Sequence, residues 1–95
     1  MYELSQKALT DINAILDWMI EQFGAQTMLE YHHSLAQCFD TLGKNPALGI
    51  KIEYIRKGYF CFYHRSHVIF YTQLKNKIFI VRILHKSMDV RRHLT

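Results

Sequence analysis

The 95-residue sequence contains only two cysteines, one proline and four glycines. Cys38 and Cys61 form no CxxC arrangement and lie among apolar neighbours, which argues against a metal or redox site and favours buried free thiols. A chain of this length fits one compact domain, so the sequence predicts a single domain over residues 1–95 and excludes a two-domain enzyme.

Long hydrophobic runs and targeting signals are also lacking. The longest apolar runs, Val68–Tyr71 and Ile78–Val81, fall far below the ~20 residues of a membrane-spanning helix. The opening Met1–Ser5 has neither the basic nor the apolar region of a secretory signal. We therefore expect a soluble protein of the cytoplasm.

Motifs for common catalytic and metal sites are missing. His32 and His33 are adjacent and point about 100° apart on a helix, and the other four histidines lack acidic or thiol companions at ligand spacing. No serine lies in a nucleophile elbow, and no glycine-rich phosphate loop exists. Asp89 follows His85 at a spacing that suits either a general-base pair or a structural link at the chain end. We predict no catalytic residue, no metal and no cofactor.

Charge is distributed unevenly along the chain. Through Asn45 there are two basic and six acidic residues, a net charge of −4, whereas from Pro46 onward ten basic and two acidic residues give +8. Such asymmetry points to a polyanionic or acidic partner that docks on the C-terminal half. The alternative is a solvated basic face without a partner. Because the basic residues are interleaved with aromatic rings, composition alone does not distinguish nucleic acid from acidic protein.

Two helices are predicted in the N-terminal half. Apolar residues recur every three or four positions from Ala8 to Phe23, so we expect a helix over about Gln6–Phe23, with Ser5 as N-cap and Gly24 at its end. A second helical stripe runs from Met28 to Leu42, and we expect Gly43 to close it. The short break between the stripes predicts an antiparallel hairpin.

A small sheet is predicted after the turn at Pro46. Residues Tyr59–His64, His67–Gln73 and Lys77–His85 are rich in β-branched and aromatic side chains and are joined by short turns. The fold class is therefore α+β, a helical hairpin packed on a C-terminal three-stranded antiparallel sheet, or a four-stranded one if Ile50–Ile55 adds an edge strand. Both sheet faces are apolar, so either a partner segment or the C-terminal tail covers the second face.

Six segments in this order resemble the ParE branch of the RelE/ParE toxin superfamily. They are Leu4-Ser5, Glu21–Gly24, Lys44–Gly49, Ile55–Tyr59, Ser66–Tyr71 and Val81–Asp89. The resemblance covers nearly the whole chain and depends most on Asn-Pro-x-Leu-Gly, His-Val-Ile-Phe-Tyr and the terminal His-x-x-Met-Asp. It implies a RelE/ParE-like fold, in agreement with the element order read from periodicity.

The resemblance also implies a function. ParE-like proteins are bacterial toxins of type II toxin-antitoxin systems, associated with plasmid stabilisation and neutralised by a ParD-like antitoxin. Characterised members inhibit DNA gyrase, and so DNA replication, by binding rather than catalysis. A first alternative is a RelE-like endoribonuclease that cleaves mRNA on the ribosome, commonly with a tyrosine near the C-terminus that Asp89–Thr95 lacks. A second alternative is an inactive member that only binds an antitoxin.

Two sets of contact residues are predicted. The basic C-terminal segment and the residues that shape it are expected to bind gyrase: Arg82, His85, Lys86, Met88, Asp89, Arg91 and Arg92. Apolar residues of the strands are expected to bind the antitoxin, an acidic segment that folds on binding: Tyr59, Phe60, Phe62, Val68, Phe70, Ile78 and Ile80.

Overall fold

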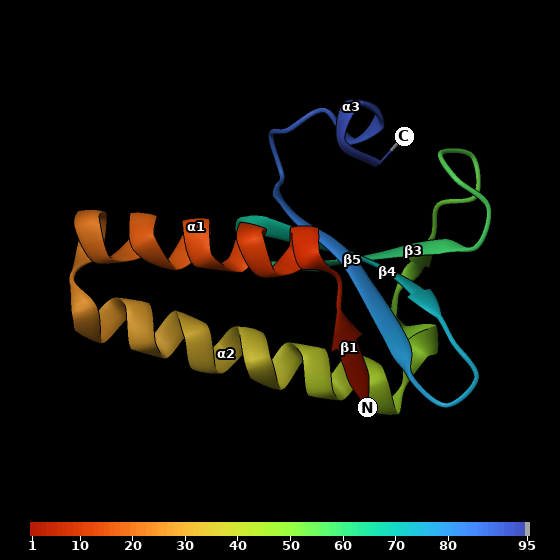
Figure 1. Ribbon diagram of the computed structural model, residues 1–95, viewed down its shortest axis with the longest axis horizontal. Coiled ribbons are helices and arrows are strands. Elements are labelled where there is room, and N and C mark those ends of the chain that lie inside the picture. The colour runs from red at the N-terminus through yellow and green to blue at the C-terminus, as the bar shows by residue number, and fades with distance from the viewer. Residues whose placement is uncertain (95) are drawn as a thin grey trace.

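The computed structural model describes residues 1–94 and has the predicted α+β architecture. Helices α1 (Gln6–Phe23) and α2 (Ala25–Lys44) form an antiparallel hairpin that packs on a sheet with the strand order β1-β5-β4-β3-β2 (Figure 1). The strands are β1 Tyr2–Leu4, β2 Ile50–Lys51, β3 Tyr59–His64, β4 His67–Gln73 and β5 Ile78–His85. The remaining elements are a 3-10 turn, η1 (Pro46–Leu48), and a short C-terminal helix, α3 (Val90–Leu94).

Helix α1 begins and ends as predicted. The Ser5 hydroxyl accepts a hydrogen bond from the Ala8 N–H at 2.9 Å and donates one to the Val81 carbonyl at 2.7 Å. It therefore satisfies a donor that helix geometry leaves free and ties the start of α1 to β5. Gly24, with φ of 89°, is the single residue between the two helices. Glycine adopts this positive φ without a steric penalty, which makes the tight hairpin possible.

Helix α2 ends one residue later than predicted. It runs through Gly43 to Lys44, and the N–H of Asn45 donates to the Thr41 carbonyl at 3.0 Å. The expectation that Gly43 closes the helix is therefore wrong. A Cβ at Gly43 would lie 2.5 Å from the backbone nitrogen of Met1. The glycine is needed because the N-terminus of the chain passes directly against α2.

Strand β1 was not predicted from the sequence. It pairs in parallel with β5, Tyr2 beside Ile78 and Leu4 beside Ile80, and the Ser5 N–H donates to the Ile80 carbonyl at 2.9 Å. Three residues are too few to show the alternation by which strands are recognised. The sheet of the described chain is thus five-stranded and mixed, rather than three- or four-stranded and antiparallel.

The central meander agrees with its prediction. Strands β3 and β4 have the expected bounds, and β5 begins one residue later than expected, at Ile78. The expected edge strand exists as β2, over Ile50–Lys51 only, and pairs with β3. Arg65, with φ of 55°, forms the turn between β3 and β4 together with Ser66.

Both faces of the sheet carry a hydrophobic core, as the apolar strands predict. Beneath the helices lies the larger cluster: Ala8, Ile12, Tyr31, Leu35, Phe39, Leu42, Ile69, Tyr71, Ile78, Ile80 and Ile83. The second face carries a smaller one: Ile52, Cys61, Val68, Phe70, Leu84 and Leu94. Leu94 of α3 and Ile52 belong to segments that cover this face, so the C-terminal tail, not an open surface, meets the second core.

Candidate functional site

Arg82 is held by the fold rather than presented to solvent. Its Nε and Nη2 donate to the two carboxylate oxygens of Asp11 at 2.8 and 2.9 Å, and both side chains are largely buried. The hydrogen bonds to Asp11 raise the pKa of Arg82, so the guanidinium stays charged. Arg82 therefore joins α1 to β5, and of the predicted target-binding residues it offers the least free surface.

The other residues predicted to bind the target form an exposed segment after β5. All of the following are exposed: His85, Lys86, Met88, Arg91 and Arg92. In the view of Figure 1 the chain after β5 lies above α1 and leads into α3. Lys86, Arg91 and Arg92 are thus three exposed cations of the C-terminal segment. Sequence order had already grouped them, because they lie within seven positions.

Asp89 has a structural role at the start of α3. Its carboxylate accepts a hydrogen bond from the Arg91 N–H at 3.1 Å, whereas Nδ1 of His85 lies 2.7 Å from the Ser87 hydroxyl. Among residues 1–94 no hydrogen bond joins His85 to Asp89, so the general-base pair considered from the sequence is not formed. Asp89 instead satisfies a free donor in the first turn of the short helix.

Two arginines, Arg56 of the loop between β2 and β3 and Arg82 of β5, hold the C-terminal helix in place. Arg56 donates to the Leu94 carbonyl at 2.9 Å, and Arg82 donates to the His93 carbonyl at 3.4 Å. The Leu94 side chain is 4% exposed and packs into the second core. The exposed cations are thus carried on a segment with a fixed position.

The residues predicted to bind the antitoxin are divided between the two faces of the sheet. Tyr59, Val68 and Phe70 belong to the second face, which α3 covers. Ile78 and Ile80 have no exposed surface and lie beneath the helices, and Phe60 and Phe62 pack against the same cluster. Ile78 and Ile80 are therefore inaccessible to any partner unless the helical layer moves. The sequence could have indicated this division, because successive residues of a strand point to opposite faces of the sheet.

A cluster of histidines and a tyrosine lies where β3, β4 and β5 meet α2. Tyr31 Oη and His67 Nδ1 are 2.6 Å apart, Ser34 Oγ lies 3.1 Å from His64 Nε2, and the rings of His67 and His85 meet edge to face at 5.6 Å. Burial, followed by His85 and His64, lowers the pKa of His67. Burial raises the pKa of Tyr31 to about 12. Both groups are therefore neutral at pH 7, and Tyr31 is not activated as a base.

The sequence did not reveal this cluster, because its members are spread from position 31 to position 85 and share no ligand-like spacing. Within residues 1–94, no three histidine, cysteine or acidic side chains come together in a way that would hold a metal ion. Burial raises the pKa of Cys38 and Cys61, which makes both thiols poor nucleophiles.

An apolar groove of about 360 Å³ opens beside this cluster. One wall is the face of α1 that carries Trp18 and Phe23, and Met88 of the C-terminal segment contributes from the other side. His67 and His85 also line the groove. Trp18 and Phe23 are 50% and 57% exposed, which is unusual for side chains of this size and marks a surface suited to an interaction.

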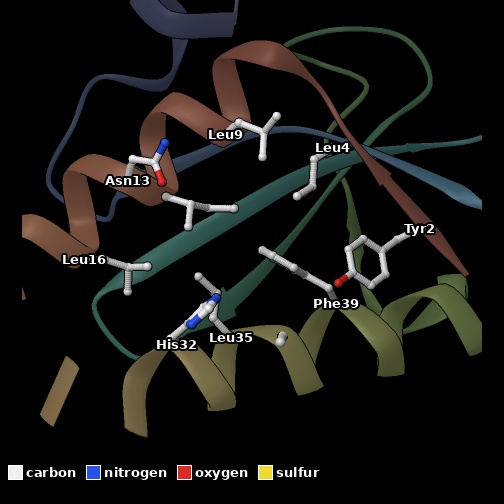
Figure 2. Close-up of a pocket in the computed structure, with 10 residues that line it drawn as sticks. Tyr2, Leu4, Leu9, Asn13, Leu16, His32, Leu35 and Phe39 are labelled. Atoms are coloured by element: carbon white, nitrogen blue, oxygen red, sulfur yellow. The ribbon is translucent and has the colours of Figure 1, made fainter. Parts of the chain in front are cut away.

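A second groove, of about 250 Å³, lies between the two helices (Figure 2). Leu9 and Leu16 of α1 point across it toward Leu35 of α2, and Phe39 packs on Tyr2 with ring centroids 5.3 Å apart. Asn13 and His32 are among its polar lining residues. No aspartate, glutamate, lysine or arginine of the described residues lines it, so it offers mainly apolar contact.

None of the helices in the described part of the chain combines the length and apolarity that a membrane crossing requires. The longest helix of this part, α2, has 20 residues, and polar residues are interspersed with apolar ones along it.

Comparisons with known proteins agree on one family. Residues 2–90 match the family model described as ParE toxin of type II toxin-antitoxin system, parDE. A protein named Toxin ParE1 from Caulobacter vibrioides is 31% identical over 93 residues, which cover 98% of this chain and 96% of that relative. Toxin ParE1 of Mycobacterium tuberculosis (strain CDC 1551 / Oshkosh) is 33% identical over 94 residues with the same coverage.

A solved structure has the same fold. It is described as the chromosomal ParDE TA system from P. aeruginosa and superposes with a TM-score of 0.76. The alignment covers 88% of this chain and 92% of that chain at 19% identity, so the likeness concerns the fold.

Proposed function

The chain belongs to the ParE toxin family of type II toxin-antitoxin systems, and on this premise we propose that it inhibits DNA gyrase and thereby blocks DNA replication. We further propose that a ParD-like antitoxin encoded beside it neutralises it. The gyrase target would place its action in the cytoplasm. The observation that supports the proposal most is the family match over residues 2–90, which includes Lys86 of the segment after β5 and ends just before Arg91 and Arg92.

The proposed target surface is the exposed C-terminal segment. Lys86, Arg91 and Arg92 are exposed there, and Asp89 is occupied with the Arg91 N–H. Guanidinium and ammonium groups on a fixed segment suit acidic protein or phosphate surfaces. His85 and Met88 flank these cations, and Arg82 positions the segment through its bonds to Asp11 and to the His93 carbonyl.

The proposed mode of action is occupation of the target, not a reaction. Burial shifts the pKa of both Tyr31 and His67, yet the two side chains hydrogen-bond to each other and lie largely buried. The alternative of ribosome-dependent mRNA cleavage would draw on the same cations of the C-terminal segment, to stabilise charge on a phosphate. The two functions therefore share a surface and differ in the target molecule.

A paired assay separates the candidates. Purified chain is added to a gyrase supercoiling reaction and, in parallel, to an in vitro translation reaction in which message length is followed. We expect supercoiling to be inhibited while the message stays intact. Cleaved message with active gyrase would instead establish the ribonuclease. If neither reaction changes, the chain is an inactive member that retains antitoxin binding only.

Charge variants test the surface. Replacing Lys86, Arg91 and Arg92 together by alanine should weaken gyrase inhibition at least tenfold. The matched control replaces three exposed lysines elsewhere, Lys7, Lys57 and Lys75, and should inhibit like the wild type. Circular dichroism checks that both variants are folded. Equal potency of the two triple variants would show that the target contacts another surface.

A further inference from the structure

The groove beside α1 combines apolar walls with hydrogen-bond donors. Trp18, Met19 and Phe23 of α1 line one side, while His67 and His85 of the sheet line the other. An apolar site with few polar groups at fixed positions selects a ligand whose polar atoms match those groups. The chemistry of the two histidines therefore decides what the groove accepts.

His85 presents its Nε2 as a donor. The backbone N–H of Ser87 donates to Nδ1 of His85 at 3.2 Å, and the Ser87 hydroxyl lies 2.7 Å from the same atom. A ring nitrogen that accepts an N–H cannot carry a hydrogen in the neutral imidazole, so the hydrogen is on Nε2. His85 is exposed, and within residues 1–94 no hydrogen bond ends on its Nε2.

His67 presents a second donor. Its Nδ1 is engaged by the Tyr31 hydroxyl at 2.6 Å. Tyr31 keeps its proton at neutral pH and can donate it to Nδ1, which places the ring hydrogen of His67 on Nε2 as well. His67 is 6% exposed and lines the groove, and within residues 1–94 no hydrogen bond ends on its Nε2.

Charge at this side of the groove is positive. Lys86 follows His85, and its N–H donates to the Ser66 carbonyl at 2.9 Å, so its backbone lies against the turn that lines the groove. Arg65 on the same turn stacks over the Tyr31 ring at 5.8 Å. Asp17 and Glu21 of α1 are exposed but are not among the residues that line the groove. An acidic group of a ligand is therefore favoured at the sheet side of the groove, where Lys86 and Arg65 lie on the adjoining backbone.

The groove is extended as well as open. A second hollow of about 240 Å³ adjoins it through the shared residues Met19, Phe23 and Ser66, and Glu30 and Arg65 contribute to its lining. Two connected hollows along a helix suit a polypeptide with several side chains better than one small molecule.

We propose that this groove binds a segment of the antitoxin in which apolar side chains flank one aspartate or glutamate, and that this carboxylate accepts hydrogen bonds from the imidazoles of His85 and His67. The inference rests on the proposed function, since it names the site at which the proposed antitoxin acts. His85 and Met88 also border the proposed target surface. An antitoxin in the groove would therefore cover part of the surface that meets gyrase, which explains neutralisation by direct occlusion.

Trp18 provides the readout, because it is the only tryptophan of the chain and stands at the wall of the groove. The full chain is titrated with the full-length antitoxin encoded beside it, and both Trp18 emission and the dissociation constant are measured. We expect binding to shift Trp18 emission, and His85→Ala to weaken binding about tenfold. His33→Ala, an exposed histidine of α2 that lines neither hollow, should bind like the wild type.

A double-mutant cycle identifies the carboxylate. Each acidic residue of the antitoxin is replaced in turn by its amide, and every antitoxin variant is tested against the wild-type chain and against His85→Ala. One replacement should weaken binding to the wild-type chain about tenfold but weaken binding to His85→Ala only slightly further. Met88→Glu, which places a carboxylate at the groove, should also weaken binding. The inference is overturned if the antitoxin binds and neutralises without changing Trp18 emission. It is also overturned if each amide variant of the antitoxin loses as much affinity for His85→Ala as for the wild-type chain. An antitoxin that neither binds nor neutralises would refute the proposed function itself.

Discussion

Asp11 of α1 holds Arg82 of β5 by two hydrogen bonds of 2.8 and 2.9 Å, and accepts a third from the Ile83 N–H at 3.0 Å. The side chains of Asp11 and Arg82 are 14% and 16% exposed, so the pair is largely withdrawn from water. Arg82 also reaches the His93 carbonyl. One carboxylate thus fixes the helical layer to the sheet and, through Arg82, helps to fix the C-terminal segment.

Asp11→Asn should strongly destabilise the fold. The amide leaves the Arg82 charge largely buried without its counter-ion, and removing one member of a buried pair costs about 3 kcal/mol. Urea unfolding followed by circular dichroism measures the loss. Asp40→Asn removes a carboxylate from the exposed pair with Lys44 and should cost under about 0.5 kcal/mol. Equal losses in the two variants would contradict a structural role for the Asp11–Arg82 pair.

Tyr71→Phe should destabilise the turn before β2. The buried hydroxyl donates to the Pro46 carbonyl at 2.6 Å and accepts from the Gly49 N–H at 3.0 Å. Without it these two backbone groups lose their partner, which costs about 1–3 kcal/mol. The free energy of unfolding measures the effect. Tyr54→Phe removes a hydroxyl from a side chain that is 74% exposed, so its stability should match that of the wild type.

Gly43→Ala should loosen strand β1. The new methyl group would lie 2.5–2.8 Å from the backbone of Met1, so the N-terminus must move away from α2. Because the Ile78 N–H donates to the Met1 carbonyl, we expect this amide to exchange its hydrogen faster, with a loss of about 1–3 kcal/mol in stability. At Gly24 a methyl group meets nothing within 4 Å. Gly24→Ala strains only its positive φ and should leave exchange at Ile78 unchanged.

Stability should fall on mild acidification. Burial lowers the pKa of His67 and His64 below the usual 6.5, so below about pH 6.5 the unfolded chain takes up protons that the folded chain refuses. The stability that these two neutral histidines contribute is therefore fully present above pH 6.5, and it is lost as the pH falls from 6.5 through their folded-state pKa values. Urea unfolding at pH 7.5 and 5.5 measures the slope. His67→Gln should flatten the dependence of stability on pH, and a slope equal to that of the wild type would exclude His67 as its source. His33→Gln is the matched control.

The periodic parts of the fold could be predicted from the sequence. The recurrence of apolar residues every three or four positions predicted α1. Ser5 and Gly24 at its ends were also predictable, because their capping roles depend only on neighbouring residues. Strands β3 and β4 were equally clear because they are long and rich in β-branched and aromatic residues. In each case the physical cause acts within one segment.

What the sequence could not predict depends on contacts between distant residues. Strand β1 exists because Leu4 meets Ile80, and Gly43 is required by Met1 rather than by the end of a helix. Arg82 looked like a free cation, since its partner Asp11 stands 71 positions away. The donors at the groove likewise depend on the contact between Tyr31 and His67, which no local spacing shows.

The parallel pairing of β1 with β5 also orders events during synthesis. Residues 2–4 are among the first to be translated, yet their partners at 78–80 are made near the end. Until then the first strand has no neighbour, and contacts of such long sequence separation form late in folding. A chain that terminates early leaves its N-terminal strand unpaired. The complete sheet, with the basic segment that follows it, therefore comes into being only when translation is almost finished.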